Sequence, residues 1–381
     1  AKYVLHFAQK AAIVMVHIRY IDNSNDFEFC RYASACRHRK EFQMQFGHFD
    51  DQQREYVITD PRTPLPWINY LGSEDFFTLL SNTAGGYCFY RDARLRRLTR
   101  YRYNNCPVDQ EGFHIYIKDG KTVWNPGWQP TKTELDRYTC RHGLGYSVIE
   151  GQKNGVSAAQ TLLVPQGENC LLIRLCLKNE TDIKKTLDVF PYVEFCLWDA
   201  MDDSSNFQRN FSIGEVELEP EAIYHKSEYR ERRNHYAVLW ANRPYDGFDT
   251  ARDAFIGPYG SPALPEAVAA GCCTGSIAHG WAPVGAMQFH LELCPGESQE
   301  LFFGLGYVEN PEGEKFSAPG VINKTRAHTM IETYRTAAQF DAAADALRGY
   351  WDTLLSNYHA KTGDEKVDRM VNIWNQYQCM V

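Results

Sequence analysis

Hallmarks of several protein classes are missing from the 381 residues of this chain. No apolar run approaches the roughly 18 residues that a membrane-spanning helix needs. The twelve cysteines form no CxxC pair and no zinc-ligand spacing, and neither the P-loop nor the dinucleotide-binding glycine pattern occurs. We therefore expect no transmembrane helix, no metal site and no cofactor, and cysteines that stay reduced in the cytoplasm.

Positive charge is also in short supply, because 48 acidic residues outnumber 40 Lys and Arg and give a formal net charge of −8. Such a chain is not built to neutralise nucleic acid. One basic run is RDARLRRLTRYRYNN at residues 91–105. Its part RLTRYRY, residues 97–103, alternates with a period of two, which places Leu98, Arg100 and Arg102 on one face of a strand. Strand arginines commonly pair with acids on neighbouring strands, and we favour that interpretation over nucleic-acid binding.

The first 43 residues contain neither Gly nor Pro and show no sustained period. Turn residues and strand-like alternation begin from Met44 onward. This change predicts that residues 1–43 are a non-native leader or a disordered extension, and that Met44 is the natural start. A genuine basic N-terminal arm is the alternative. The apolar run before His17 is too short for a signal peptide, so we expect no export.

Short alternating or apolar runs recur between about residues 46 and 310, and turn clusters such as NPGWQP and CPGES separate many of them. Amphipathic helices do not alternate with these runs, which argues against a parallel α/β sheet. The pattern predicts a mainly β fold, with one large antiparallel β-sandwich at residues 44–315.

The sequence period changes after about residue 320. Apolar positions at 330, 331, 334, 347, 351 and 355 predict two helices in a linker at residues 316–360. In the last segment, residues 361–381, Val367, Met370, Trp374 and Tyr377 share one face of a third helix. This helix has no C-terminal cap, which suggests that the chain was cut inside a further helical domain.

The segment FCLWDAMDDSSNFQRN, residues 195–210, joins an apolar strand to an acidic turn. Paired carboxylates are the signature of glycoside hydrolysis, but acidic turns are common, and the residues alone do not favour catalysis. The candidates are Glu194, Asp199, Asp202 and Asp203. Cys140 and His142 suggest a nucleophile pair, but neighbours in sequence rarely have the needed geometry, and we predict a loop or core histidine.

Seven long strings are more specific than any short motif. Over residues 44–381 they closely resemble the cellobiose phosphorylases of glycoside hydrolase family 94. The strings are FGHFDDQQREYVITDPRTPLPWINYLGSEDFF, LLSNTAGGYCFYRDARLRRLTRYRYNN, GWQPTKTELDRYTCRHGLGYS, VEFCLWDAMDDSSNFQRNFSIGEVE, AIYHKSEYRERRNHYAV, GFDTARDAFIG and DEKVDRMVNIWNQYQCMV.

The resemblance implies a β supersandwich, linker helices, an (α/α)6 barrel that carries the chemistry, a small C-terminal β domain and a homodimer. Residues 361–381 would be the first helix of that barrel. The implied reaction is reversible, inverting phosphorolysis of cellobiose to α-glucose 1-phosphate and glucose. A carboxylic acid protonates the leaving oxygen while phosphate attacks from the opposite face. Phosphate is the co-substrate, and because it is already an anion, it needs no general base.

The same resemblance places the catalytic Asp and the main phosphate-binding residues beyond Val381, so we expect this chain alone to be inactive. It places Gln208 and Arg209 in the acceptor glucose site, bonded to sugar hydroxyls, with Asp199 and Asn206 at the entrance. The family usually has Asn where this chain has Asp199. The alternative is a sheet-closing turn in which Arg209 pairs with Asp202 or Asp203.

Other functions stay open at this point. Cellodextrin, laminaribiose and chitobiose phosphorylases share the implied architecture, and barrel residues largely set their linkage specificity. A different class of function is a non-catalytic module for carbohydrate binding or dimerisation.

Overall fold

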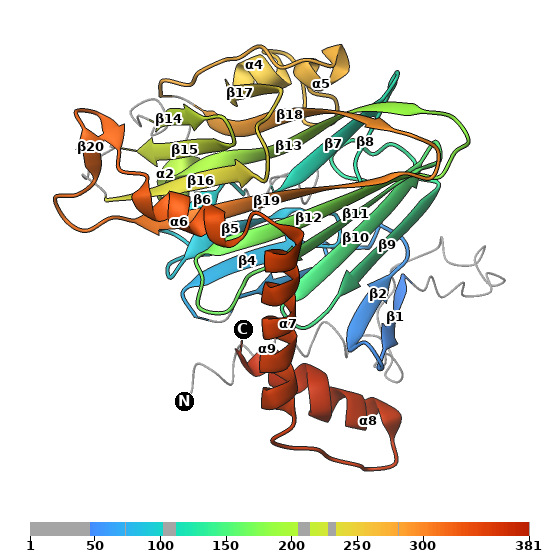
Figure 1. Ribbon diagram of the computed structural model, residues 1–381. Coiled ribbons are helices and arrows are strands. Elements are labelled where there is room, and N and C mark those ends of the chain that lie inside the picture. Colours follow the sequence, from blue (N-terminus) through green and yellow to red (C-terminus); the bar gives the residue numbers. More distant parts are fainter. Residues whose placement is uncertain are drawn as a thin grey trace, which may run out of the picture. The chain divides into compact units, whose positions relative to one another are not determined.

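A computed structural model describes residues 46–72, 74–101, 112–204, 214–227, 234–280 and 282–380. The predicted leader, residues 1–43, lies outside this range. Two large antiparallel sheets make up most of the described chain, so the predicted mainly β fold is confirmed (Figure 1). Neighbouring strands of the ten-stranded sheet run, in order, β1 (Gly47–Asp50), β2 (Glu55–Ile58), β9 (Arg137–His142), β10 (Tyr146–Lys153), β11 (Val156–Leu163), β12 (Cys170–Asn179), β19 (Ser298–Glu309), β16 (His235–Ala241), β15 (Ala222–Ser227) and β14 (Gly214–Glu219).

The nine-stranded sheet is built around strand β13, which pairs with β18 along one edge and with β7 and β6 along the other. Its main path is β17 (Gly247–Ala251), β18 (Pro283–Leu293), β13 (Lys185–Trp198), β6 (Arg97–Thr99), β5 (Gly86–Tyr90), β4 (Phe76–Ser81) and β3 (Ile68–Leu71), and β7 (His114–Asp119) and β8 (Thr122–Trp124) lie beside β13.

The main core lies between the two sheets. Strand β11 shows how the sequence produces it, because Val156, Ala158 and Leu162 are buried while the intervening side chains are only partly covered. This alternation follows from the period of two along a strand. The strand β13 differs, because every residue from Val189 to Trp198 is buried. The short helices α4 (Arg252–Ile256) and α5 (Glu266–Ala270) cover the outer face of its sheet with a second apolar cluster (Figure 1).

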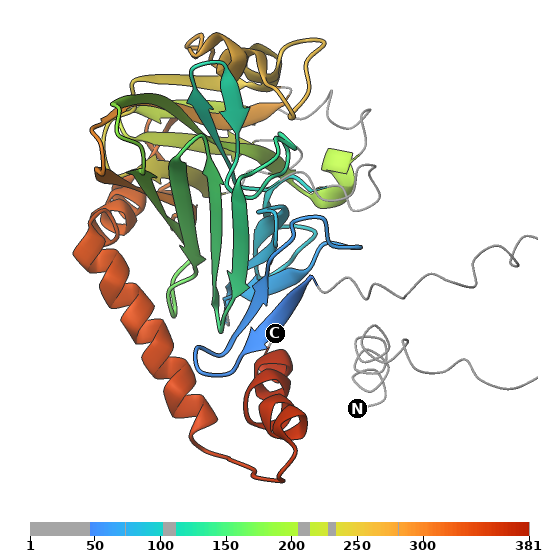
Figure 2. The ribbon, with the colours of Figure 1, turned by 90° about the vertical axis from the view of Figure 1, so that its right-hand side faces the viewer.

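Helices α6 (Thr325–Thr333) and α7 (Ala337–Leu355) cover the outer face of the ten-stranded sheet (Figure 2). The small hairpin of β20 (Phe316–Ala318) and β21 (Val321–Ile322) precedes them. Helix α7 begins at a capping box, in which Thr336 and Gln339 bond to each other's backbone N–H groups. Its buried residues recur every three or four positions, as the sequence predicted, and pack on the sheet: Phe340, Ala343, Leu347, Trp351 and Leu355.

Residues 365–380 are also helical, in the order α8 (Glu365–Arg369), the π-helical turn η2 (Met370–Trp374) and α9 (Asn375–Met380). The hydroxyl of Tyr377 lies 2.8 Å from the Asn69 side chain of β3 and accepts a hydrogen bond from the backbone N–H of Gly145. The C-terminal helix is therefore held against the sandwich. Within the described residues, no helix is both long enough and apolar enough to cross a membrane.

Gly304 tests the packing of α6 and α7 on the sheet. A Cβ added to Gly304 of β19 would lie 1.9 Å from the indole of Trp240 on the paired strand β16. Because the site is closely packed, we expect Gly304→Ala to lower the free energy of unfolding by about 1–3 kcal/mol. Gly349→Ala is the control, because Gly349 is exposed on α7 with open space around it, and Ala should stabilise that helix. Urea denaturation measures both, and equal stabilities would contradict this packing.

Candidate functional site

Strand β13 ends at Trp198, directly before the residues predicted to form the acceptor site. This residue is fully buried and has φ of 70°, in the left-handed region that aromatic residues rarely adopt. Its ring meets the ring of His235 edge-on at 4.4 Å and that of Tyr307 at 5.9 Å. Aromatic contacts therefore fix the direction in which the chain leaves the sheet.

Asp199 lies at the start of helix α2 (Ala200–Ser204). Its Oδ1 accepts hydrogen bonds from the backbone N–H groups of Met201 at 2.9 Å and Asp202 at 3.2 Å. The Arg94 guanidinium lies 3.8 Å from the same oxygen, and the Asp199 side chain is 17% exposed. Asp199 is thus an N-terminal cap of α2. Its predicted place at a sugar site stays a prediction.

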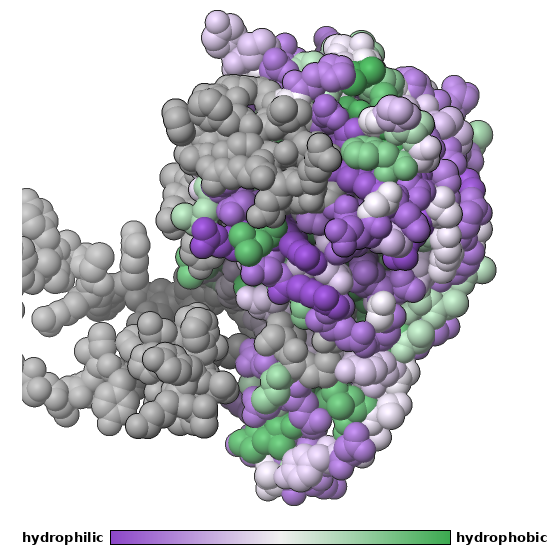
Figure 3. Space-filling model, turned by 90° about the vertical axis from the view of Figure 1, so that its left-hand side faces the viewer, coloured by the Kyte–Doolittle hydropathy of each residue, from purple (hydrophilic) through white to green (hydrophobic). Residues whose placement is uncertain are grey.

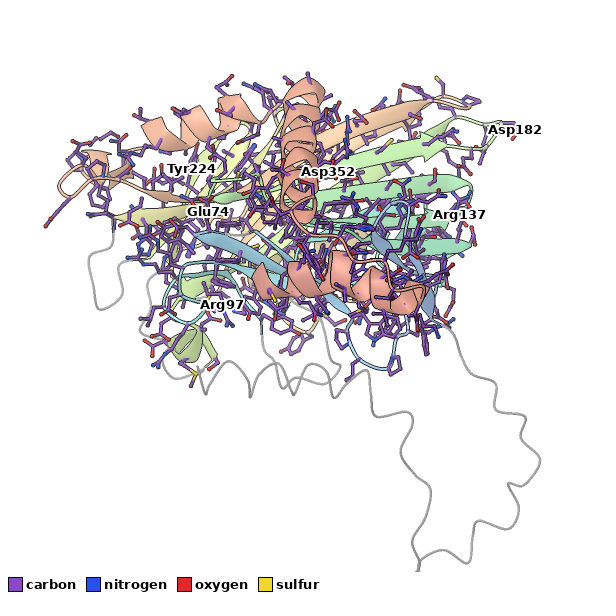
Figure 4. All side chains as sticks on the ribbon, turned by 90° about the horizontal axis from the view of Figure 1, so that it is seen from below. Glu74, Arg97, Arg137, Asp182, Tyr224 and Asp352 are labelled. Carbon is purple, nitrogen blue, oxygen red and sulfur yellow. The ribbon has the colours of Figure 1, made fainter. Side chains whose placement is uncertain are left out.

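Gln208, Arg209 and Asn206, the other predicted site residues, lie outside the described residues. The part of the sandwich that leads to them is described. Figure 4 labels Arg97, the first residue of β6 and the partner of Trp198, near one end of the sandwich, with Arg137 and Asp182 near the opposite end. Strand β13 therefore ends at the same end of the sandwich as Arg97.

A buried ion cluster anchors α2 to the nine-stranded sheet. The Arg100 guanidinium binds both carboxylate oxygens of Asp203, at 2.8 and 3.0 Å, and reaches Glu194 at 3.0 Å. The other oxygen of Glu194 accepts hydrogen bonds from Arg252 and from the Tyr192 hydroxyl, each at 2.8 Å. Arg100, Glu194 and Asp203 are at most 6% exposed. Two cations thus balance two anions.

The cluster sets the protonation state of Glu194. Burial alone would raise the pKa of this carboxyl, but the charges of Arg100 and Arg252 and the hydrogen bonds outweigh burial and lower the pKa to about 2. Asp203 is held by a bidentate guanidinium. Glu194 is therefore not suited to hold the proton that a general acid donates, and the ion pairs of both carboxylates with Arg100 give them a structural role. The cluster also occupies Asp203, which the alternative interpretation had paired with Arg209.

The predicted pairing of strand arginines with acids is confirmed for Arg100, and the signal was its period-two position beside Leu98. Arg97 is half-buried over the ring of Tyr87 at 4.1 Å and donates to the carbonyl of Ala93. Arg252, the second cation of the cluster, was missed. It lies in a different part of the sequence, and no local pattern marks it.

His225 of β15 lies beside this cluster. It is fully buried, stacks on Phe195 with ring centroids 4.9 Å apart, and has no hydrogen-bond partner at either ring nitrogen within the described chain. Burial lowers the pKa of His225 to about 3, and the charges of Asp203 and Arg100 act in opposite directions on it. A neutral histidine therefore packs beside the ion cluster.

Cys140 and His142 were considered as a nucleophile pair. The Cys140 sulfur lies 3.7 Å from Nε2 of His142, which is close enough for such a pair. However, burial raises the pKa of the Cys140 thiol and lowers that of His142 to about 4. The imidazole is engaged with Ser147 and the Trp67 carbonyl, so His142 is a core histidine, as predicted. No cluster of His, Cys, Asp and Glu suited to a metal ion occurs in the described ranges either.

Comparison with known families decides the assignment. The pattern of "Glycosyl hydrolase 94, supersandwich domain" matches residues 54–337. That of "Glycosyl hydrolase 94 superfamily, catalytic domain" matches residues 350–381. The chain belongs to the glycosyl hydrolase 94 family. The expected family and its supersandwich are thereby confirmed.

Curated relatives within the glycosyl hydrolase 94 family include two named N,N'-diacetylchitobiose phosphorylase. The one from Vibrio proteolyticus is 33% identical and the one from Vibrio furnissii 35% identical, and each alignment covers 88% of this chain and 40% of the relative. A 3-O-β-D-glucopyranosyl-β-D-glucuronide phosphorylase from Paenibacillus borealis is 27% identical over 88% of this chain and 41% of its own length. The chain thus spans about 40% of the length of these relatives.

Replacing Asp203 with Asn tests the ion cluster. The change keeps the shape of the side chain but leaves Arg100 buried with one counter-charge fewer, so we expect a loss of about 3–5 kcal/mol in the free energy of unfolding. Asp345→Asn is the matched control, because Asp345 is exposed and its pair with Arg348 is open to water. Chemical denaturation should leave the control unchanged. A loss for Asp203→Asn no larger than that of the control would refute the anchoring role.

His225 should make the protein sensitive to acid. The unfolded chain takes up a proton near the ordinary value of 6.5, whereas the folded pKa is about 3, so stability falls as pH drops through this window. His225→Phe should therefore lose about 2 kcal/mol less stability than the parent between pH 7 and pH 5. His359→Phe, at an exposed position, should keep the parent slope. Urea denaturation at the two pH values measures the difference, and parallel slopes for all three proteins would contradict the prediction.

Proposed function

We propose that this chain is the sandwich-bearing portion of an inverting disaccharide phosphorylase. The observation that carries the proposal is the order of the two matches, supersandwich at residues 54–337 and catalytic domain at residues 350–381, on one chain. The names of the relatives, which are disaccharide phosphorylases, support the reaction class. Inorganic phosphate is the proposed co-substrate, and a homodimer the proposed assembly.

The proposed mechanism divides the work between the domains. A carboxylic acid of the barrel protonates the glycosidic oxygen, and phosphate attacks the anomeric carbon from the opposite face. Positively charged side chains of the barrel hold the phosphate oxygens. The sandwich contributes the segment after α2, whose Gln208 and Arg209 are proposed to bind the hydroxyls of the acceptor sugar. The ion cluster of Arg100 supports this proposal, because it fixes the helix from which that segment starts.

N,N'-diacetylchitobiose is the first proposed substrate, because the two Vibrio relatives, at 33% and 35% identity, carry its name. Cellobiose, which the long sequence strings favoured, is the second. The two disaccharides differ by the acetamido groups at C2, which need space and hydrogen-bond partners that hydroxyls do not. The discriminating residues are proposed to lie mainly in the barrel.

A product assay on the complete protein tests the reaction. With inorganic phosphate, we expect release of the α-sugar 1-phosphate from N,N'-diacetylchitobiose at a kcat/KM about tenfold above that for cellobiose, since a buried polar group left unpaired costs about 1–3 kcal/mol. The opposite ratio would assign cellobiose. Saturable sugar binding with no sugar 1-phosphate from any β-linked disaccharide would favour a non-catalytic carbohydrate-binding module instead.

Arg209→Ala in the complete protein tests the acceptor segment. In the synthetic direction, we expect the KM for the acceptor sugar to rise about tenfold or more, since a charge-assisted hydrogen bond is removed. The KM for phosphate in phosphorolysis should change much less. Arg348→Ala, at an exposed position on α7, serves as the control. Equal losses for acceptor and phosphate would remove Arg209 from the acceptor site.

A further inference from the structure

A polar cavity of about 520 Å³ lies between strand β19, helix α6 and the turn that joins β5 to β6. The stacked rings of Tyr90 and Tyr307, with centroids 4.1 Å apart and planes 9° apart, form part of its wall. Figure 3 views the molecule from the side on which the β20 hairpin lies, and hydrophilic residues predominate there outside the grey atoms. The cavity volume is within the range of small-molecule sites.

Three arginines converge on this cavity, two from the turn that joins β5 to β6 and one from α6. Arg91 and Arg96 approach the same ring of Tyr90, with guanidinium carbons 5.0 and 5.6 Å from its centroid. Arg326 enters from α6. The lining holds one carboxylate, Glu309, so three positive charges face one negative charge, an excess of two. Asp75, outside the lining, binds Arg91 and reduces the excess to one.

The carboxylates near the cavity do not satisfy all of its hydrogen-bond donors. The Glu309 carboxylate is shared between the Tyr307 hydroxyl at 2.6 Å and Arg96 at 3.3 Å. Arg326 donates to the main-chain carbonyl of Glu309 at 3.1 Å and forms no ion pair with a described carboxylate. The half-buried side-chain amide of Asn169 also lacks a partner within the described ranges. Guanidinium and amide donors therefore point to an acceptor-rich ligand.

We propose that this cavity binds a monosaccharide phosphate, with the phosphate on Arg96 and Arg326 and the sugar toward Asn169. A phosphate monoester carries between one and two negative charges near neutral pH, which matches the excess in the lining, and arginine is suited to its oxygens. Inorganic phosphate alone would leave most of the volume empty. The inference stands on the described residues and does not depend on the proposed reaction.

Calorimetric titration of this chain at fixed ionic strength near 0.15 M tests the site. Glucose 6-phosphate is the probe, because the proposed phosphorolysis does not produce it. We expect saturable binding that weakens at least tenfold in Arg96→Gln and in Arg326→Gln, while Arg348→Gln, which removes one exposed arginine elsewhere, binds like the parent. Asn169→Asp adds a negative charge with little change in shape and should also weaken binding. Circular dichroism confirms that each variant is folded.

Titrations with three further compounds show which parts of the ligand the site recognises. Glucose should not bind measurably, and inorganic phosphate and glucuronate should each bind at least tenfold more weakly than glucose 6-phosphate. If glucuronate binds more tightly than glucose 6-phosphate, the site recognises a carboxylate and not a phosphate. If inorganic phosphate binds as tightly as glucose 6-phosphate, the site does not recognise the sugar. Either result overturns the proposal. It is also overturned if glucose 6-phosphate does not saturate the parent, or binds the Arg96 and Arg326 variants unchanged.

Discussion

The carboxylate of Glu194 joins parts of the fold that the chain itself keeps far apart. Through Arg100 it connects β13 to the end of β6 and to Asp203 of α2, and through Arg252 it reaches the start of α4. Three of the four charges in this ion cluster, on Glu194, Arg100 and Asp203, are buried, and the fourth, on Arg252, is 35% exposed. Removing any one member would leave an uncompensated charge, which costs far more than an exposed ion pair contributes. This constraint ties α2 and the start of α4 to one arrangement on the nine-stranded sheet.

Much of the fold follows from local patterns in the sequence. The alternation in β11 and the spacing from Phe340 to Leu355 in α7 each reflect one buried face, and such periods are legible without a structure. The continuous burial of β13 is less legible, because a run that is apolar on both faces has no period. The covering helices α4 and α5 have five residues each and carry almost no periodic signal.

The candidate site was predictable only where its charges obey the strand period. Arg100 could be assigned a pairing role from its position beside Leu98. Asp203 was considered only as a candidate carboxylate or as a partner of Arg209, because its contact with Arg100 spans 103 positions of the chain. The ion pairs of Glu194 with Arg100 and Arg252 argue against a general-acid role for that carboxyl. The reaction class, which these residues alone do not reveal, is proposed from the names of the related phosphorylases. The arginine-lined cavity was not predictable from the sequence, since its lining comes from four separate segments.

Helix α7 has a consequence for how the protein can be divided. The supersandwich match ends at residue 337, where this helix begins, and the catalytic-domain match starts at residue 350, inside it. Yet Phe340 packs on Phe302 of the sheet, and Trp351 packs on Tyr377 of the C-terminal helix. A cut at either boundary would separate aromatic side chains that pack on each other and would expose apolar surface, which promotes aggregation, on both pieces. The two family matches divide the chain into two domains, but the smallest fragment suitable for expressing the sandwich alone includes the whole of α7.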